Sequence, residues 1–212
     1  MEQLIEETIQ FVKDCLEGDA SGHDWYHISR VHKVARLLCE KEGGNLFIIE
    51  MAALLHDVAD EKLNESEEIG LRRVNDFLYP RVGEEDRIHI LSIIQNMSFK
   101  GGHGGQLDTI EGKIVQDADR IDALGAIGIA RTFAYGGSKG RLMYDPEVPP
   151  RLHMTKEEYR SGNSTSLNHF YEKLFKLKDL MNTEAARELA NERHAYMKQF
   201  AEQFMKEWNV ER

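Results

Sequence analysis

The chain has 212 residues, of which 27 are basic and 37 acidic, and its formal net charge is -10. A chain of this length can enclose a sizeable core and most simply forms one domain. The acidic balance excludes a general surface for nucleic acid or anionic membranes, but it leaves room for a local phosphate pocket. No run of about 18 apolar residues and no signal-peptide pattern occurs, so we expect a cytoplasmic protein. Cys15 and Cys39 lack disulfide or zinc-site spacing, which agrees with a reducing compartment.

Apolar residues recur at helical spacing along most of the chain, and no segment predicts a strand. Each expected helix begins or ends near a recognisable capping or breaking residue, such as Asn64 or Ser66 at one start and Pro80 at one end. We expect helices on the stripes Leu4–Leu16 and Ile28–Leu38, and then over about 45–57, 66–79, 84–97, 109–117, 119–135, 164–181 and 183–208. The pattern therefore predicts an all-α fold.

Two irregular segments interrupt the helical pattern. The first, at 98–108, is rich in glycine, and the second, at about 136–162, contains GGSKGR and three of the four prolines. Connections longer than about 15 residues inside a domain are more often binding loops or lids than neutral chain. We expect both segments to serve a site.

The stretch LLHDVADEK, at 54–62, ends an apolar run with His56, Asp57 and Asp60. On a continuous helix, His56 and Asp60 would lie on one face and Asp57 would flank it. Because isolated charges are costly to bury, two carboxylates and a histidine at the end of a core helix imply a cation or strong hydrogen bonds. The alternative is an ordinary helix end whose polar residues reach solvent.

Two further segments supply residues of the same kinds. His27 begins an amphipathic stripe, so its ring should lie at the margin of the buried face. QDADRID, at 116–122, supplies Asp119 and Asp122 among apolar residues. Either part has a simpler explanation, since His27 could be a satisfied core histidine and Asp119 a helix cap or a partner of Arg120. Together the segments favour a metal site.

In this order, His27, the pair His56-Asp57 and the aspartate in DADR resemble the H...HD...D motif of the HD-domain metal-dependent phosphohydrolases. The strings DWYHISRV, ALLHDVADEK, QDADRIDALGAIGIAR and YGGSKGRLMYDP also resemble a group of small stand-alone bacterial HD proteins, some described as nucleotide pyrophosphohydrolases. The resemblance implies an all-α HD-type helical bundle as a single domain over residues 1–212. The C-terminal helices, at about 164–208, would pack on the metal-binding core.

The resemblance also implies a set of site residues. His27, His56, Asp57 and Asp119 would be the metal ligands, with Asp122 as the alternative fourth ligand. This mixed set of imidazoles and carboxylates suits a divalent ion, with Mn²⁺ favoured and Mg²⁺, Co²⁺, Ni²⁺, Fe²⁺ or Zn²⁺ as alternatives. A divalent ion activates water and polarises a phosphoryl oxygen. In related HD enzymes an acidic residue at the spacing of Asp60 orients or deprotonates that water.

Cations must balance the charge of a phosphorylated substrate. The candidates stand at the ends of the acidic segments or in the two glycine-rich loops, where free backbone N–H groups could assist them. They are Lys62, Lys100, Arg131, Lys139 and Arg141. GGSKGR lacks the spacing of a P-loop, and its glycines could instead simply permit turns.

The favoured reaction is hydrolysis of a (deoxy)nucleoside triphosphate to a monophosphate and pyrophosphate, which follows from the resemblance. Spacing alone supports only metal-assisted hydrolysis of a nucleotide or phosphate ester. The alternatives are a nucleoside monophosphate phosphatase, a phosphodiesterase and a catalytically silent metal or nucleotide sensor. An acidic all-α adaptor would require the histidine and aspartate segments to be incidental. We expect a small-molecule partner, no nucleic acid and no membrane, and the sequence leaves a homodimer open.

Overall fold

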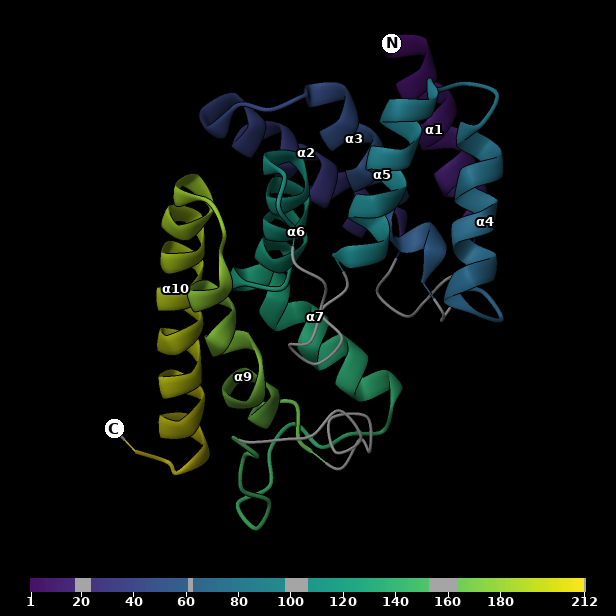
Figure 1. Cartoon of the computed structure of the whole chain (residues 1–212). Helices are drawn as coiled ribbons and strands as arrows, with labels where there is room; N and C mark the ends of the chain where they lie inside the picture. The colour runs from purple at the N-terminus through teal and green to yellow at the C-terminus, as the bar shows by residue number, and fades with distance from the viewer. Residues whose placement is uncertain (18–23, 61–62, 98–106, 153–163, 212) are drawn as a thin grey trace. The chain divides into compact units, whose positions relative to one another are not determined.

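The structure is a computed structural model that describes residues 1–17, 24–60, 63–97, 107–152 and 164–211. Lys62 and Lys100, two of the expected phosphate-binding residues, lie outside this part. Every regular element in it is a helix, which confirms the all-α fold (Figure 1). None of the described helices combines the length and the apolar character needed to cross a membrane. The chain divides into two compact units, Met1–Asp119 and Arg120–Arg212, and its description as one domain stays a prediction.

The first unit is built around the buried helix α3(Leu46–Leu55), which packs against α1, α2 and α5. Seven of the ten residues of α3 are buried, and most are fully inaccessible to solvent. A helix that is apolar on nearly all sides belongs in the centre of a core. The surrounding elements are α1(Glu2–Cys15), α2(Trp25–Glu42), η1(His56–Ala59), α4(Glu67–Leu78), α5(Glu84–Asn96) and the part of α6(Ile110–Asp122) up to Asp119.

Helices α2 and α3 form a tight hairpin (Figure 1). Gly43 ends α2 with φ of 81°, a left-handed conformation that favours glycine, and its N–H donates to the carbonyl of Cys39. Asn45 then caps α3, because its side-chain oxygen accepts hydrogen bonds from the N–H groups of Phe47 and Ile48. Since helices joined by so short a loop run antiparallel, the start of α2 and the end of α3 lie at the same end of the hairpin.

Helix α3 ends earlier than the sequence predicted. The α-helix stops at Leu55, residues His56–Ala59 continue as the 3₁₀ helix η1, and Asp60 is extended with ψ of 139°. The expectation that His56 and Asp60 share one face of a continuous helix is therefore wrong. Helix α4 begins after Ser66, whose hydroxyl accepts from the N–H of Ile69, so Ser66 rather than Asn64 is the cap.

Helix α6 corrects a second expectation. The sequence predicted a break between residues 117 and 119, but α6 runs without interruption from Ile110 to Asp122. Its apolar stripe passes through the predicted break, since Val115, Ala118 and Ile121 are all fully buried. The chain bends only after Asp122, where Gly125 begins the next helix with φ of 72°.

The second unit contains α7(Gly125–Ser138), α9(Asn168–Glu172), η3(Leu174–Leu180) and α10(Glu184–Trp208). Its core is aromatic, with the ring of Phe133 about 6 Å from the rings of Phe170, Phe200 and Phe204. A single helix over 164–181 was wrong, because the chain forms the short α9 and then η3. Just before α9, the N–H groups of Ser166 and Leu167 donate to the carbonyls of Leu142 and Met143 instead of continuing a helix.

Candidate metal centre

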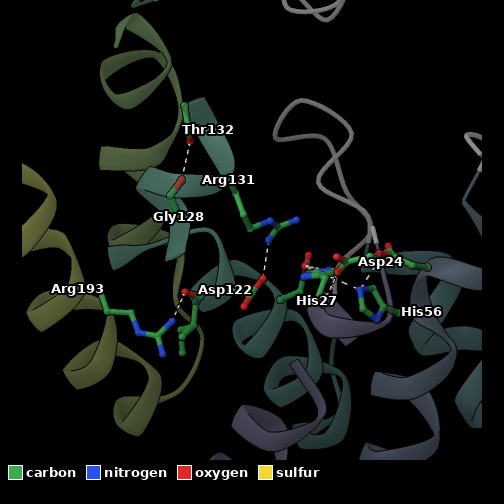
Figure 2. Close-up of polar contacts among 11 residues, drawn as sticks. Asp24, His27, His56, Asp122, Gly128, Arg131, Thr132 and Arg193 are labelled. Atoms are coloured by element: carbon green, nitrogen blue, oxygen red, sulfur yellow. Dashed lines mark hydrogen bonds and ion pairs between the residues drawn. The ribbon is translucent and has the colours of Figure 1, made fainter. Parts of the chain in front are cut away.

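His27 is placed by the first turn of α2. Asp24 caps this helix, and its carboxylate accepts a hydrogen bond from the backbone N–H of His27 at 2.9 Å (Figure 2). The residue is 1% exposed, so its ring is buried. The cap therefore fixes the backbone from which the imidazole projects. The position of Asp24 before an amphipathic stripe is a helix-start signal that the sequence reasoning missed.

His56 is placed by the end of α3. Its Nδ1 lies 2.8 Å from the carbonyl oxygen of Ala53. Because a carbonyl only accepts, Nδ1 carries the proton, and Nε2 of the neutral ring offers a lone pair. This Nε2 atom is buried and has no hydrogen-bond partner among the described residues. The rings of His27 and His56 lie 5.4 Å apart, edge to face (Figure 2).

Two carboxylates face these imidazoles. Asp57 bridges them, with Oδ2 3.4 Å from Nε2 of His27 and Oδ1 3.4 Å from Nε2 of His56. Asp119, on α6, places Oδ1 3.5 Å from Nε2 of His27 and 3.9 Å from Nε2 of His56. The structure thus brings together all four ligands proposed from the sequence, although the aspartates differ in exposure. The side chain of Asp57 is 10% exposed, and that of Asp119 is 40% exposed.

These distances fit a metal ion better than direct hydrogen bonds. Nitrogen and oxygen atoms in a hydrogen bond are about 2.7–3.2 Å apart, whereas two ligand atoms each about 2.1 Å from an ion are about 3.0–4.2 Å apart. One ligand atom each from His27, His56 and Asp119 lies within 4.8 Å of the others. In addition, the lone pair on Nε2 of His56 faces carboxylate oxygens, which are also acceptors. A cation at their common focus satisfies all of them, so the donor set fits a divalent metal.

Asp60 follows His56 and Asp57 along the chain. It is half-buried and follows η1 in an extended conformation, and its N–H donates to the carbonyl of Asp57 at 3.0 Å. The side chain therefore projects from a residue with extended backbone after the 3₁₀ turn rather than from a helix face. Its expected role with water stays a prediction.

Asp122, the alternative ligand, belongs to a different interaction. Its Oδ2 accepts a hydrogen bond from Nη1 of Arg131 at 2.6 Å, within the second unit (Figure 2). The side chain of Asp122 is only 2% exposed, so this ion pair compensates a buried charge. This geometry favours Asp119 over Asp122 as the fourth ligand.

Lys139 and Arg141 flank one aromatic ring at the end of α7. Nζ of Lys139 lies 5.7 Å from the centre of the Tyr135 ring, and Cζ of Arg141 lies 5.6 Å from it. The backbone contributes less than expected, because the N–H groups of Lys139, Gly140 and Arg141 all donate to carbonyls at the end of α7. The prediction that backbone N–H groups are free to bind an anion is therefore wrong at these three residues. The side chains of Lys139 and Arg141 remain the candidates for binding phosphate.

Comparison with known proteins agrees with this site. A model of the HD domain matches residues 24–124, which include His27, His56, Asp57 and Asp119. The protein YpgQ of Bacillus subtilis (strain 168) is 42% identical over 205 residues, which cover 95% of this chain and 92% of YpgQ.

Solved structures share the fold over nearly the full chain. The crystal structure of an HD-superfamily hydrolase from Bacillus thuringiensis is 64% identical, covers 99% of both chains and has a TM-score of 0.80. The crystal structure of Bacillus subtilis YpgQ in complex with ADP is 39% identical, covers 96% of this chain and 97% of that chain, and has a TM-score of 0.74. The chain therefore belongs to the HD superfamily of metal-dependent phosphohydrolases.

Proposed function

We propose that the protein is a nucleotide pyrophosphohydrolase that converts a nucleoside triphosphate to the monophosphate and pyrophosphate. The observation that carries the proposal is the convergence of imidazole and carboxylate acceptors around Nε2 of His56, a buried atom with no hydrogen-bond partner among the described residues. His27, His56, Asp57 and Asp119 would hold a divalent ion, for which we favour Mn²⁺. When bound, such an ion supplies an activated water and an electrophile for a phosphoryl oxygen.

Asp60 is the proposed group that orients or deprotonates the attacking water. It is half-buried and three residues beyond Asp57, on the segment that leaves η1. A carboxylate at hydrogen-bond distance from a water can accept its proton as the phosphorus–oxygen bond forms. The backbone at Asp60 is extended, and it follows directly on the turn that carries His56 and Asp57.

A nucleotide substrate is supported by the relative YpgQ, whose crystal structure holds ADP. In this chain, Lys139 and Arg141 are the described cations that we assign to the outer phosphates. The ammonium group of Lys139 and the guanidinium group of Arg141 both lie within cation–π distance of the Tyr135 ring. Arg131 is a weaker candidate because Asp122 already balances part of its charge.

Hydrolysis of ATP by protein reloaded with Mn²⁺ in H₂¹⁸O tests the reaction. Phosphorus NMR should show monophosphate and pyrophosphate, and the ¹⁸O label in the monophosphate would place the attack on the α-phosphorus. An analogue with a methylene group between the α- and β-phosphates should resist hydrolysis. The β,γ-methylene analogue should still be cleaved between its α- and β-phosphates. Release of orthophosphate and ADP would refute the proposed bond.

The same assay separates the alternatives. A monophosphatase would release orthophosphate from AMP, and a phosphodiesterase would cleave cyclic nucleotides while sparing ATP. A silent sensor would bind Mn²⁺ and a nucleotide without turnover under any of these conditions.

A further inference from the structure

The turn that carries His56 and Asp57 is intrinsically weak. It consists of the four-residue 3₁₀ helix η1, which follows the end of α3 and gives way to extended chain at Asp60. Short 3₁₀ helices have poorer hydrogen-bond geometry than α-helices, and carbonyls at helix ends need partners from outside the helix. Groups outside η1 must therefore hold it if the ligands are to keep their positions.

Asn64 supplies two of those groups. Its side-chain Nδ2 donates to the carbonyl of Val58 at 2.8 Å and to the carbonyl of Asp60 at 2.9 Å. Both partners are acceptors, so the amide nitrogen faces the turn and each of its hydrogens serves one carbonyl. One side chain thereby ties the end of η1 to the residue that follows it.

Helix α4 packs closely against the same turn at Gly70. A Cβ atom at Gly70 would lie 2.6 Å from the carbonyl oxygen of Ala59, 2.7 Å from the Cα of Ala59 and 2.7 Å from Nδ2 of Asn64. The buried Gly70 thus lets the backbone of α4 approach Ala59 as closely as it does. Any larger residue would displace the turn or the amide that holds it.

We propose that Asn64 is a positioning residue of the metal centre, and that with Gly70 it holds η1 in the conformation that aims His56 and Asp57 at the metal. On the other side, the bond between His56 Nδ1 and the Ala53 carbonyl fixes the ring. Asn64 acts through its hydrogen bonds to the backbone of the turn and is not one of the four proposed ligands. This inference rests on the proposed function, because it assigns the metal to His56 and Asp57.

The test uses two variants of the turn with matched controls. Asn64→Ala removes both hydrogen bonds, and Asn64→Asp keeps the size of the side chain while presenting oxygens to two carbonyls. The control Asn96→Ala removes an amide that also donates to a backbone carbonyl, that of Ser92 at 2.8 Å. Gly70→Ala is paired with Gly83→Ala, whose added Cβ would meet no atom within 4 Å.

Hydrogen–deuterium exchange of the metal-free protein reports on the turn itself. Amides in a peptide covering residues 56–60 should exchange faster in Asn64→Ala, Asn64→Asp and Gly70→Ala than in the wild type. Both controls should match the wild type there. Unchanged exchange in the two Asn64 variants would overturn the inference, whatever their activity. If Gly70→Ala fails to fold, the two Asn64 variants are sufficient to test the inference.

Metal titration and kinetics then test the positioning role. The dissociation constant for Mn²⁺ should rise about 10- to 100-fold in Asn64→Ala, as for other groups that orient metal ligands. The kcat should fall while KM for the nucleotide changes little, because Asn64 holds ligands rather than substrate. Wild-type affinity for Mn²⁺ in Asn64→Ala would refute the role. If the wild type binds Mn²⁺ but does not cleave triphosphates, only the proposed reaction fails.

Discussion

Asp122 and Arg131 form a buried, hydrogen-bonded ion pair with a separation of 2.6 Å. The pair bears on two assignments at once, because Asp122 was the alternative metal ligand and Arg131 a candidate for substrate phosphate. The carboxylate, 2% exposed, depends on the guanidinium for charge compensation. The pair therefore points to a structural role for Asp122 and leaves Asp119 as the proposed ligand.

Asparagine substitutions separate the two aspartates. Asp119→Asn should lower the metal content, since it replaces a charged ligand with a weak neutral one. Asp122→Asn should retain the metal but lower the free energy of unfolding by about 2 kcal/mol, because it removes the charge from a buried hydrogen bond to Arg131. Metal analysis of the purified proteins and urea denaturation measure these effects. Loss of metal in Asp122→Asn with full retention in Asp119→Asn would reverse the assignment.

Removal of either member of the HD pair should empty the centre. His56→Ala and Asp57→Ala each delete a proposed ligand that is buried, so we expect most of the metal to be lost on dialysis and kcat to fall with it. His89→Ala, at a histidine that contacts Thr109 and Glu111 instead, serves as the control. Unchanged metal in both ligand variants, measured by mass spectrometry, would contradict the site.

Asp60→Asn tests proton transfer apart from metal binding. The substitution preserves size and removes the charge, so the metal should stay while kcat falls roughly 100-fold or more. Steady-state kinetics with ATP and metal analysis of the same preparation provide both measurements. Full activity of this variant would show that Asp60 has no role in proton transfer.

The paired change Lys139→Ala and Arg141→Ala tests the proposed contact with the outer phosphates. Hydrolysis of a triphosphate should weaken much more than hydrolysis of a small artificial phosphodiester, because the latter lacks the remote charges. Metal content should not change. Values of kcat/KM for the two substrates give the comparison, and an equal loss on both would mean that the loop supports the fold instead.

His169 should make the second unit sensitive to acid. Burial and the nearby Lys173 lower the pKa of His169 from 6.5 to about 4. Between these values the unfolded chain binds a proton that the folded chain does not, so the free energy of unfolding should fall by at most about 3 kcal/mol as the pH drops from 6.5 to 4. His169→Gln should remove this part of the pH dependence in urea denaturation. If the free energy of unfolding falls with pH equally steeply in the variant and the wild type, His169 is not the source of this pH dependence.

Much of the fold could be predicted from apolar periodicity and caps. The long amphipathic stripes in α1, α2, α5 and α10 are regular, and Gly43 and Ser66 mark ends that the structure confirms. The break predicted within α6 was wrong because the apolar stripe of this helix continues past Asp117 and Asp119, and Asp117 is itself fully buried. The start of α9 at Asn168 instead of near residue 164 goes with hydrogen bonds to Leu142 and Met143, which are distant in sequence.

The candidate site was predictable in its residues but not in its geometry. The resemblance to the HD-domain phosphohydrolases implied His27, His56, Asp57 and Asp119 as ligands, and the structure brings these four residues together. The change from α3 to η1 was not visible in the sequence, since a 3₁₀ turn follows from packing rather than from periodicity. For the same reason the role of Asn64 was hidden, and its sequence position suggested only a helix cap.

The unequal exposure of the four proposed ligands gives the centre a direction for loading. Side chains of His27 and His56 are 2% and 4% exposed, whereas that of Asp119 is 40% exposed. A hydrated ion arriving from solvent would therefore meet the Asp119 carboxylate first, exchange part of its water there, and reach the imidazoles last. Chelators would draw the ion out by the reverse route. The order of ligand exchange would thus be set by burial, and Asp119 would govern how fast the centre fills and empties.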